Sequence, residues 1–338
     1  MKEYIIGPGD EGIRLDKQLL KILNNAGSGF VYRMLRKKNI TLNDRKASGN
    51  EHLSSGDVIK IFLSDETFEK FSGKNKTDEL RAEDKAQVSG SINDIIIHED
   101  EDLLIVNKPS GLLTQKASAQ DISLNEMCLS YLTDKGEISD ETLKMFRPSV
   151  CNRLDRNTSG IVIFAKNYRA ASTISRALKE RTINKYYLCI VKGRVNKEGR
   201  KTAYLVKDIR SNRVRVSDTD EKGASVINTL YRPLRTADGY SLLEVELITG
   251  KSHQIRAQMA HIGHPLIGDY KYGDKKLNDD LKARFNISSQ VLHAYKLVIP
   301  DKQGEDTERY AGTYIAPPPE YMKELIEELF SCDMIDLR

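Results

Sequence analysis

The most informative stretch of this sequence reads Cys151-Asn152-Arg153-Leu154-Asp155-Arg156-Asn157-Thr158-Ser159-Gly160 and is followed by the apolar run 161–165. A short apolar run of this kind is typical of a buried strand, so the ten residues form a polar turn that leads into it. Asp155 lies between two arginines in that turn. It caps the turn, pairs with an arginine, or serves as a nucleophile or base that nearby cations keep ionised. The turn alone leaves these interpretations open.

Residues 250–265 form a second stretch with chemical potential, and their spacing predicts a helix from His253 onward. Its inward apolar stripe consists of Ile255, Met259 and Ile262. Arg256 and His253 share another face near the start of this helix. The segment 250–252 looks like the end of a phosphate-binding P-loop, but that motif needs glycine at position 245, where this chain has valine. The histidines of this stretch have no cysteine partner and form no H-E-x-x-H pattern, so we expect no metal site here.

The third stretch, residues 183–193, alternates as a strand does. One face carries Lys185, Tyr187 and Cys189, and the other carries Tyr186, Leu188 and Ile190. A tyrosine in a strand usually packs in the core, but a tyrosine that faces a cleft can stack on a nucleobase. The alternation predicts which residues share a face and does not choose between these two roles for Tyr187.

The chain from residue 93 onward predicts more strands than helices. The expected strands are 103–106, 161–165, 186–191, 204–207, 225–231, 242–248 and 292–299, and the expected helices are 125–134, 167–180, 253–262 and 319–330. Helices inserted in long connections between paired strands predict an α+β fold around a mixed, mainly antiparallel sheet. We expect this part, residues 93–338, to be one large domain.

A smaller domain is expected at residues 1–64, followed by a flexible linker at 65–92 that is rich in charged and small polar residues. The small domain predicts helices at 13–23 and 30–38, the second capped by Ser28, and strands at 40–43 and 58–63. The second helix gathers four cations, Arg33, Arg36, Lys37 and Lys38, within two turns. They form either a solvated face or a surface that contacts phosphates.

The charges nearly cancel, with 53 Lys and Arg against 49 Asp and Glu in 338 residues. This balance and the 39% hydrophobic content exclude a histone-like polycation and an acidic disordered chain. The region 166–215, however, holds 15 basic and 3 acidic residues, which predicts a local RNA-binding surface. We expect no membrane helix and no signal peptide, because no apolar run is long enough. Four cysteines without a C-x-x-C pair predict free thiols in a reducing, cytoplasmic setting.

In this order, the motifs of residues 93–317 resemble those of RluA-type RNA pseudouridine synthases. The marks are Asn107-Lys108-Pro109-Ser110-Gly111, the Arg153-Leu154-Asp155 turn with Thr158-Ser159-Gly160, Lys185-x-Tyr187, Gly250-Lys251-Ser252-His253-Gln254-Ile255-Arg256, and His261 to Asp269 with Tyr272-Gly273. The first 64 residues resemble, by order and spacing, the small α/β RNA-binding domain shared with a small-subunit ribosomal protein. The combination is similar to the branch that modifies large-subunit (23S) ribosomal RNA. It implies the pseudouridine synthase fold, an α+β sheet with flanking helices and a central catalytic cleft.

The resemblance also implies roles for individual residues. Asp155 is the expected catalytic carboxylate, which attacks the uridine base or its ribose, and Tyr187 stacks on the uracil. Arg256 keeps Asp155 ionised, since an unpaired buried carboxylate takes up a proton. Four substrate-binding residues are expected: Arg153, which fills the gap left by a flipped base, Ile255, Asn152 and Lys108. Asn152 stands where histidine is usual in this family and cannot titrate, so we expect it to position backbone or RNA.

Several alternatives remain at this stage. The isomerisation neither oxidises nor hydrolyses its substrate, so we expect no cofactor and no metal, and RNA as the partner of a monomer. The substrate is ribosomal RNA or, alternatively, transfer RNA. A non-catalytic RNA-binding protein of ribosome assembly is the interpretation if Asp155 only caps a turn. A Ser/His hydrolase is suggested by Ser252 beside His253, but the G-x-S-x-G elbow of such enzymes is missing.

Overall fold

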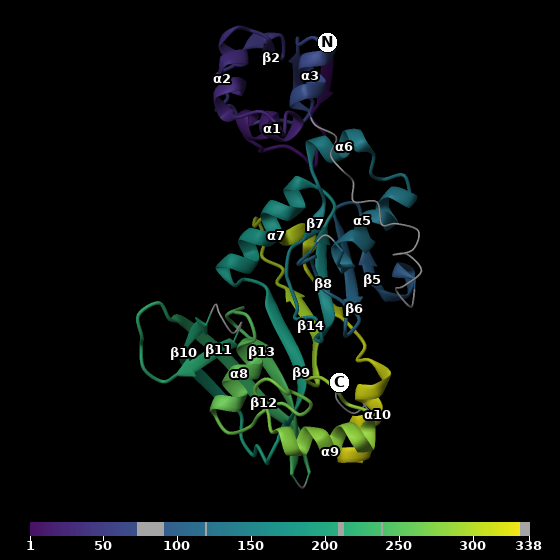
Figure 1. Ribbon diagram of the computed structural model, residues 1–338, viewed down its shortest axis with the longest axis vertical. Coiled ribbons are helices and arrows are strands. Elements are labelled where there is room, and N and C mark those ends of the chain that lie inside the picture. The colour runs from purple at the N-terminus through teal and green to yellow at the C-terminus, as the bar shows by residue number, and fades with distance from the viewer. Residues whose placement is uncertain (73–90, 119, 209–212, 238, 332–338) are drawn as a thin grey trace.

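The computed structural model describes residues 1–72, 91–118, 120–208, 213–237 and 239–331, and Figure 1 shows a small N-terminal unit set on one end of a larger body. The N-terminal unit packs helices against one side of a four-stranded sheet of order β1-β4-β2-β3. Its elements are β1 (Lys2–Ile5), α1 (Leu15–Ile22), α2 (Ser28–Arg36), β2 (Ile40–Leu42), β3 (Arg45–Lys46), β4 (Val58–Ile61) and α3 (Asp65–Phe71).

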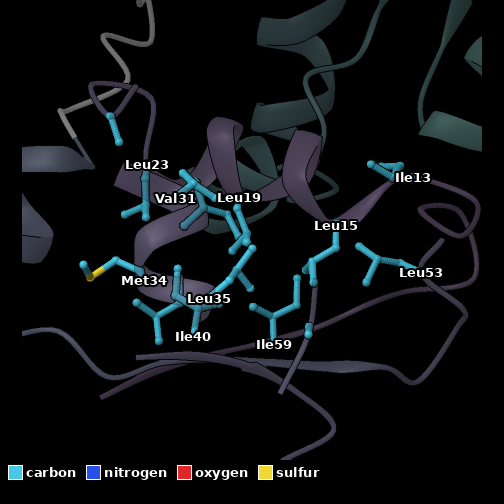
Figure 2. Packing of buried hydrophobic residues seen from close by; sticks show 14 of the residues in the cluster. Ile13, Leu15, Leu19, Leu23, Val31, Met34, Leu35, Ile40, Leu53 and Ile59 are labelled. Carbon is cyan, nitrogen blue, oxygen red and sulfur yellow. The ribbon is translucent and has the colours of Figure 1, made fainter. Parts of the chain in front are cut away.

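The core of this unit follows from the apolar spacing of its helices. Leu15 and Leu19 of α1 meet Leu35 of α2 above the sheet, which contributes Ile40 and Ile59 (Figure 2). All five side chains are almost completely buried, and each contributes roughly 1.5–3 kcal/mol to folding. The expected cap of α2 was wrong in one respect. Its N-cap residue is Gly27 rather than Ser28, and no side chain caps the helix.

The expected linker begins too early at residue 65. Helix α3 covers Asp65–Phe71, and the hydroxyl of Ser64 caps it by accepting a hydrogen bond from the backbone N–H of Thr67. Phe68 is buried in the N-terminal core, and Phe71 stacks on Phe30 with 4.0 Å between ring centroids. Two aromatic rings three residues apart provide the apolar face that the scarcity of aliphatic residues concealed. The remaining part of the expected linker, 73–90, lies outside the described residues.

The large domain is built on one extended sheet. Its main path is β11-β10-β12-β13-β9-β14-β8-β6-β5, with β15 paired to β14 and β7 paired to β8. The strands are β5 (Ile96–Glu99), β6 (Leu103–Lys108), β7 (Ser149–Val150), β8 (Ser159–Ala165), β9 (Asn184–Lys192), β10 (Gly199–Asp208), β11 (Arg213–Ser217), β12 (Ser225–Ala237), β13 (Tyr240–Leu247), β14 (Leu292–Ile299) and β15 (Gly312–Ile315). Only β14 and β8 pair in parallel among the described strands, so the expected mixed, mainly antiparallel sheet is confirmed.

Helices cover both faces of this sheet (Figure 1). They are α5 (Leu124–Asp134), α6 (Asp140–Met145), α7 (Tyr168–Glu180), α8 (Gln254–His261), α9 (Lys275–Phe285) and α10 (Glu320–Phe330), with short 3-10 turns at η1 (Ile92–Ile95) and η2 (Glu308–Tyr310). On β9, Tyr187 and Cys189 face the cluster that contains α8, whereas Leu188 and Ile190 face the cluster of α9 and α10. The predicted alternation of this strand is therefore confirmed.

Gly160 lets the polar turn run directly into the sheet. The residue pairs with Ala294 in the parallel contact of β8 with β14 and has a φ of 117°. A Cβ at this position would lie only 2.2 Å from the carbonyl oxygen of Ala294. Any other residue would therefore force β8 and β14 apart at the point where the turn that carries Asp155 ends.

The two domains are in contact, although the sequence predicted only a tether between them. Gln18 of α1 donates a hydrogen bond of 3.0 Å to the carbonyl of Met145 at the end of α6. The ammonium of Lys21 lies 5.6 Å from the ring centroids of both Phe146 and Tyr168. α1 therefore rests on α6 and the start of α7. None of the described helices is long and apolar enough to span a bilayer.

Candidate active site

A cleft of about 830 Å³ opens between the polar turn 151–158, strand β9 and the start of α8. Asp155, Tyr187 and Arg256, which are 101 residues apart at the extremes, all line it. Ile255 and Arg153 line it as well. The structure thus brings together the residues that the sequence selected from three separate stretches.

Arg256 lies at the centre of the cleft and joins two carboxylates. One guanidinium nitrogen, Nη1, donates to Oδ2 of Asp155 at 3.1 Å. The opposite edge of the guanidinium makes a bidentate pair with Asp269, with Nε to Oδ2 at 2.7 Å and Nη2 to Oδ1 at 2.9 Å. Arg256 is 8% exposed and Asp269 is 1% exposed. A planar guanidinium held on two sides in this way has a fixed orientation.

Asp269 was not recognised from sequence as a site residue, although it ends a motif quoted above. Its Oδ1 also accepts the backbone N–H groups of Lys271 at 2.9 Å and Tyr272 at 3.1 Å. Burial raises the pKa of this carboxyl, but the hydrogen bonds and charge of Arg256 outweigh burial and hold the pKa below its ordinary value. The sequence did contain a signal for this role. Asp269 is a second carboxylate close in sequence to the helix of Arg256, an arginine for which only Asp155 had been expected as a partner.

Asp155 remains accessible while it is paired. Its side chain is 27% exposed, against 9% for that of Arg256. The ring of His253 lies 3.9 Å from Oδ2 of Asp155, and its Nδ1 lies 2.8 Å from the hydroxyl of Tyr272. Burial lowers the pKa of His253, and the charge of Asp155 opposes this shift. The pKa of His253 is thus held below its ordinary value, and the cation that pairs with the Asp155 carboxylate is Arg256.

The apolar part of the cleft is suited to a flat ring. Tyr187 is 7% exposed and shares a cluster with Ile255, Leu154 and Leu292, and all four line the cleft. Burial, reinforced by the charge of Asp155, raises the pKa of the Tyr187 phenol, so it stays protonated. An aromatic face beside an ionised carboxylate fits a nucleobase that has been turned out of its stack.

Lys108 does not bind substrate, contrary to the expectation. The side chain is fully buried, and its ammonium donates to the carbonyls of Pro109, Leu112 and Arg156 at 2.7 to 2.9 Å. Burial lowers its pKa to about 7, and the charge of Asp155 acts against that shift. All of its donors are used to tie the segment after β6 to the catalytic turn, so none is left for RNA. The hydroxyl of Thr114 also donates a hydrogen bond of 2.9 Å to the carbonyl of Leu154 in the same turn.

Asn152 uses its amide on the neighbouring strand. Its Nδ2 donates to the carbonyl of Ile161 at 3.1 Å, and its Oδ1 accepts the N–H of Ile163 at 2.8 Å. Asn152 also lines the cleft, so its expected contact with substrate stays a prediction. Of the two expected roles, backbone positioning is the one that the structure contains. The reason is that an amide can satisfy one donor and one acceptor of a strand edge together.

The remaining predicted residues are exposed cations. Arg153 lies on the catalytic turn at the rim of the cleft. Arg33 and Arg36 of α2, with Lys37 and Lys38 directly after it, are exposed on the N-terminal domain. In the described part of the chain no group of three or more His, Cys, Asp or Glu side chains is arranged to hold a metal ion.

Comparison with known proteins places this cleft in a family. The pattern described as RNA pseudouridylate synthase matches residues 102–261, which include Asp155, Tyr187 and Arg256. The ribosomal large subunit pseudouridine synthase C of Rickettsia conorii is 30% identical over 293 residues, 86% of this chain and 89% of that protein. This chain belongs to the RNA pseudouridylate synthase family. The protein of the same name from Vibrio cholerae is 30% identical over 295 residues, 84% of each chain.

Solved structures of pseudouridylate synthases show the same fold. The human RNA pseudouridylate synthase domain containing 4 protein matches with a TM-score of 0.57 at 20% identity, over 70% of this chain and 94% of that one. The human domain containing 1 protein matches with a TM-score of 0.51 at 24% identity, over 69% and 87%. As a member of this family, the enzyme is an isomerase that converts uridine in RNA to pseudouridine, which confirms the expected fold and reaction.

Proposed function

We propose that this pseudouridine synthase modifies uridines of large-subunit ribosomal RNA, with Asp155 as its catalytic carboxylate. The observation that carries the assignment of Asp155 is its pairing with Arg256, the arginine that Asp269 holds from the other side. The substrate is proposed because relatives that match over most of both chains are named ribosomal large subunit pseudouridine synthases. Transfer RNA and a purely structural role in ribosome assembly have no observation in their favour.

The proposed reaction begins with a uridine flipped into the cleft. Asp155, ionised beside Arg256, attacks the base or deprotonates the ribose, and the bond between N1 and the sugar breaks. The uracil turns while stacked on Tyr187, and its carbon 5 bonds to the same sugar carbon. The proton of carbon 5 then passes to N1, and the protonated phenol of Tyr187 assists as a relay that gives up its own proton as it receives the one from carbon 5. Asp155 is regenerated as the carboxylate. Arg153, at the cleft rim, occupies the gap that the flipped base leaves in the RNA.

The test of the catalytic carboxylate is Asp155→Asn in the purified enzyme. The substitution keeps the size of the side chain and removes its charge, so we expect pseudouridine formation to fall at least about 1,000-fold. The matched control is Asp301→Asn, which changes an exposed aspartate remote from the cleft and should leave the rate unchanged. Pseudouridine formation by Asp155→Asn at a rate near that of the wild type contradicts the assignment.

The test of the substrate is a map of pseudouridines in all RNA from a strain that lacks the gene. We expect particular sites in the large-subunit ribosomal RNA to revert to uridine, and to return when the wild-type gene is supplied. Supplying the Asp155→Asn gene should not restore them. A loss confined to transfer RNA contradicts the proposed substrate while leaving the proposed chemistry intact.

We further propose that the N-terminal domain adds affinity for RNA through the exposed cations of α2 and the two lysines after it. A ribosomal substrate and the three described cysteines, which are free, support action in the cytoplasm. That the enzyme works as a monomer without metal stays a prediction. Sedimentation of the active protein tests whether it is a monomer. Its activity in the presence of EDTA tests whether it needs a metal.

A further inference from the structure

The charges that line the cleft are strongly unequal. Among the described residues that line it, Asp155 is the single carboxylate, while seven are lysine or arginine: Arg153, Arg156, Lys185, Lys207, Lys251, Arg256 and Lys271. Asp155 is already paired with Arg256. The cleft therefore carries a large excess of positive charge, which an uncharged nucleobase does not neutralise. An RNA substrate brings compensating charge only through its phosphates.

Among these cleft cations, Lys185 has the least favourable surroundings for a positive charge. It lies on the same face of β9 as Tyr187 and is partly buried. Its ammonium has no hydrogen bond or ion pair to any residue in the described ranges. Burial lowers the pKa of Lys185, and the charge of Arg181 lowers it further. The protonated amine is thus poorly compensated in the free enzyme, and an anion beside it would stabilise it.

The ammonium of Lys185 lies beside the exposed backbone of Gly250. A Cβ placed on Gly250 would lie 4.0 Å from Nζ of Lys185, and no other atom outside the adjoining residues lies that close. Gly250 and the next residue, Lys251, are both exposed, and both line the cleft. An anion that enters the cleft can therefore reach Nζ of Lys185 beside the backbone of Gly250, with Lys251 the next residue in the chain.

We propose that Lys185 and Lys251, on either side of Gly250, form a subsite for a phosphate of the substrate RNA next to the flipped uridine. The inference rests on the proposed action of the cleft on RNA and assigns a role to two residues outside the reacting centre. Lys185 and Tyr187 are two residues apart on one face, which is about 7 Å along a strand. A uracil stacked on Tyr187 thus brings the phosphates of its own nucleotide to Lys185.

The test uses a short RNA that the wild-type enzyme modifies, made in versions with an uncharged methylphosphonate at one linkage near the target uridine. One such version should raise the KM of the wild-type enzyme about tenfold or more. Lys185→Gln should raise the KM for unmodified RNA by a similar factor and leave kcat near the wild-type value. The same variant should no longer respond to the methylphosphonate at that linkage, because its glutamine has no charge to pair with the phosphate.

Two further variants keep the test decisive. Lys251→Gln is an exposed substitution that does not threaten folding, and it should show the same loss of response at the same or the neighbouring linkage. Lys185→Arg retains the charge and should restore part of the affinity. Lys282→Gln, on the exposed side of α9, is the control and should behave as the wild type does. Lysine variants that respond to every neutral linkage as strongly as the wild type overturn the phosphate subsite.

Failure of the subsite is distinguishable from failure of the proposed substrate. The measurement uses whichever RNA the wild-type enzyme modifies, so a transfer RNA substrate would refute the ribosomal assignment without affecting this test. The salt dependence gives a second measure. Removing one lysine that binds a phosphate should reduce the slope of log KM against log salt by about 0.7 for single-stranded RNA. An unchanged slope in both lysine variants contradicts the proposal.

Discussion

Two groups of positive charge in this enzyme are held in different ways. Arg36, Lys37 and Lys38 of the N-terminal domain are exposed and have no ion pair with a described residue. Arg256 of the cleft is buried between Asp155 and Asp269 and has a fixed orientation. Exposed cations attract phosphates from many directions and are screened by salt. A buried, doubly paired arginine acts through geometry instead, so the two groups should respond differently to substitution.

Among the substitutions that test this contrast, Asp269→Asn should have the largest effect. The amide cannot accept the hydrogen bonds of both Nε and Nη2 of Arg256 as the carboxylate does, so Arg256 loses its orientation toward Asp155. We expect kcat to fall about 100-fold with little change in KM, and the free energy of unfolding to fall by about 3 kcal/mol, because a buried pair is broken. Steady-state kinetics and denaturant titration measure the two effects. Asp301→Asn serves as control, and an unchanged kcat contradicts the positioning role.

The same variant has a defined pH dependence. The pKa of Asp269 is held below its ordinary value of 3.8 in the folded protein. Its contribution to stability is therefore fully present above about pH 4 and is lost as the pH falls through the lower, folded pKa. The difference in unfolding free energy between wild type and Asp269→Asn should be constant from about pH 7 to about pH 5 and shrink below about pH 4. A difference that grows on acidification would exclude the ion pair as its source.

A smaller effect is expected from Arg256→Lys. Lysine retains the charge but presents one nitrogen, which cannot bridge two carboxylates with a planar fork. We expect kcat to fall about tenfold to 100-fold, less than on loss of Asp155. Arg284→Lys, an exposed substitution on α9, should have no effect. If Arg256→Lys matches the wild type in kcat, charge alone suffices and the contrast between the two groups of cations disappears.

Removal of two exposed cations should act on binding alone. For the double variant Arg36→Gln and Lys37→Gln we expect the KM for ribosomal RNA to rise about tenfold at low salt, with kcat unchanged. The salt slope of binding should decrease by about 0.7 to 0.9 for each phosphate that the variant no longer binds. Lys282→Gln controls for a general change in net charge. A fall in kcat at saturating RNA would show that α2 contributes more than affinity.

The smallest effect is expected at the contact between the domains. Gln18→Ala removes the hydrogen bond to the carbonyl of Met145, which we expect to weaken docking by about 1–2 kcal/mol. The KM for long ribosomal RNA should rise severalfold, whereas turnover of a short RNA should not change. Small-angle scattering measures the accompanying loss of compactness, with the exposed Lys17→Ala as control. An unchanged scattering profile indicates that other contacts hold the domains together.

Local patterns in the sequence determined much of this protein. The spacing of apolar residues predicted α1, α7 and α10 and the alternation of β9. It could do so because the side of a helix or strand on which a side chain lies follows from its position relative to its neighbours in sequence. The same logic placed Asp155 in a polar turn before a buried strand. It did not predict α3, since two aromatic residues within a highly charged segment carry little periodic signal.

Only the tertiary structure decided the partners of the buried charges. Asp269 is 13 residues from Arg256, and Lys108 is 48 residues from the carbonyl of Arg156 that it binds. Neither separation matches the spacing of a helix or strand, so no local sequence pattern could reveal these pairs. A buried ion must be compensated by whatever group folding brings beside it, so its role depends on the packing of elements distant in sequence. Residue type indicated the chemistry, and long-range packing selected the atoms that perform it.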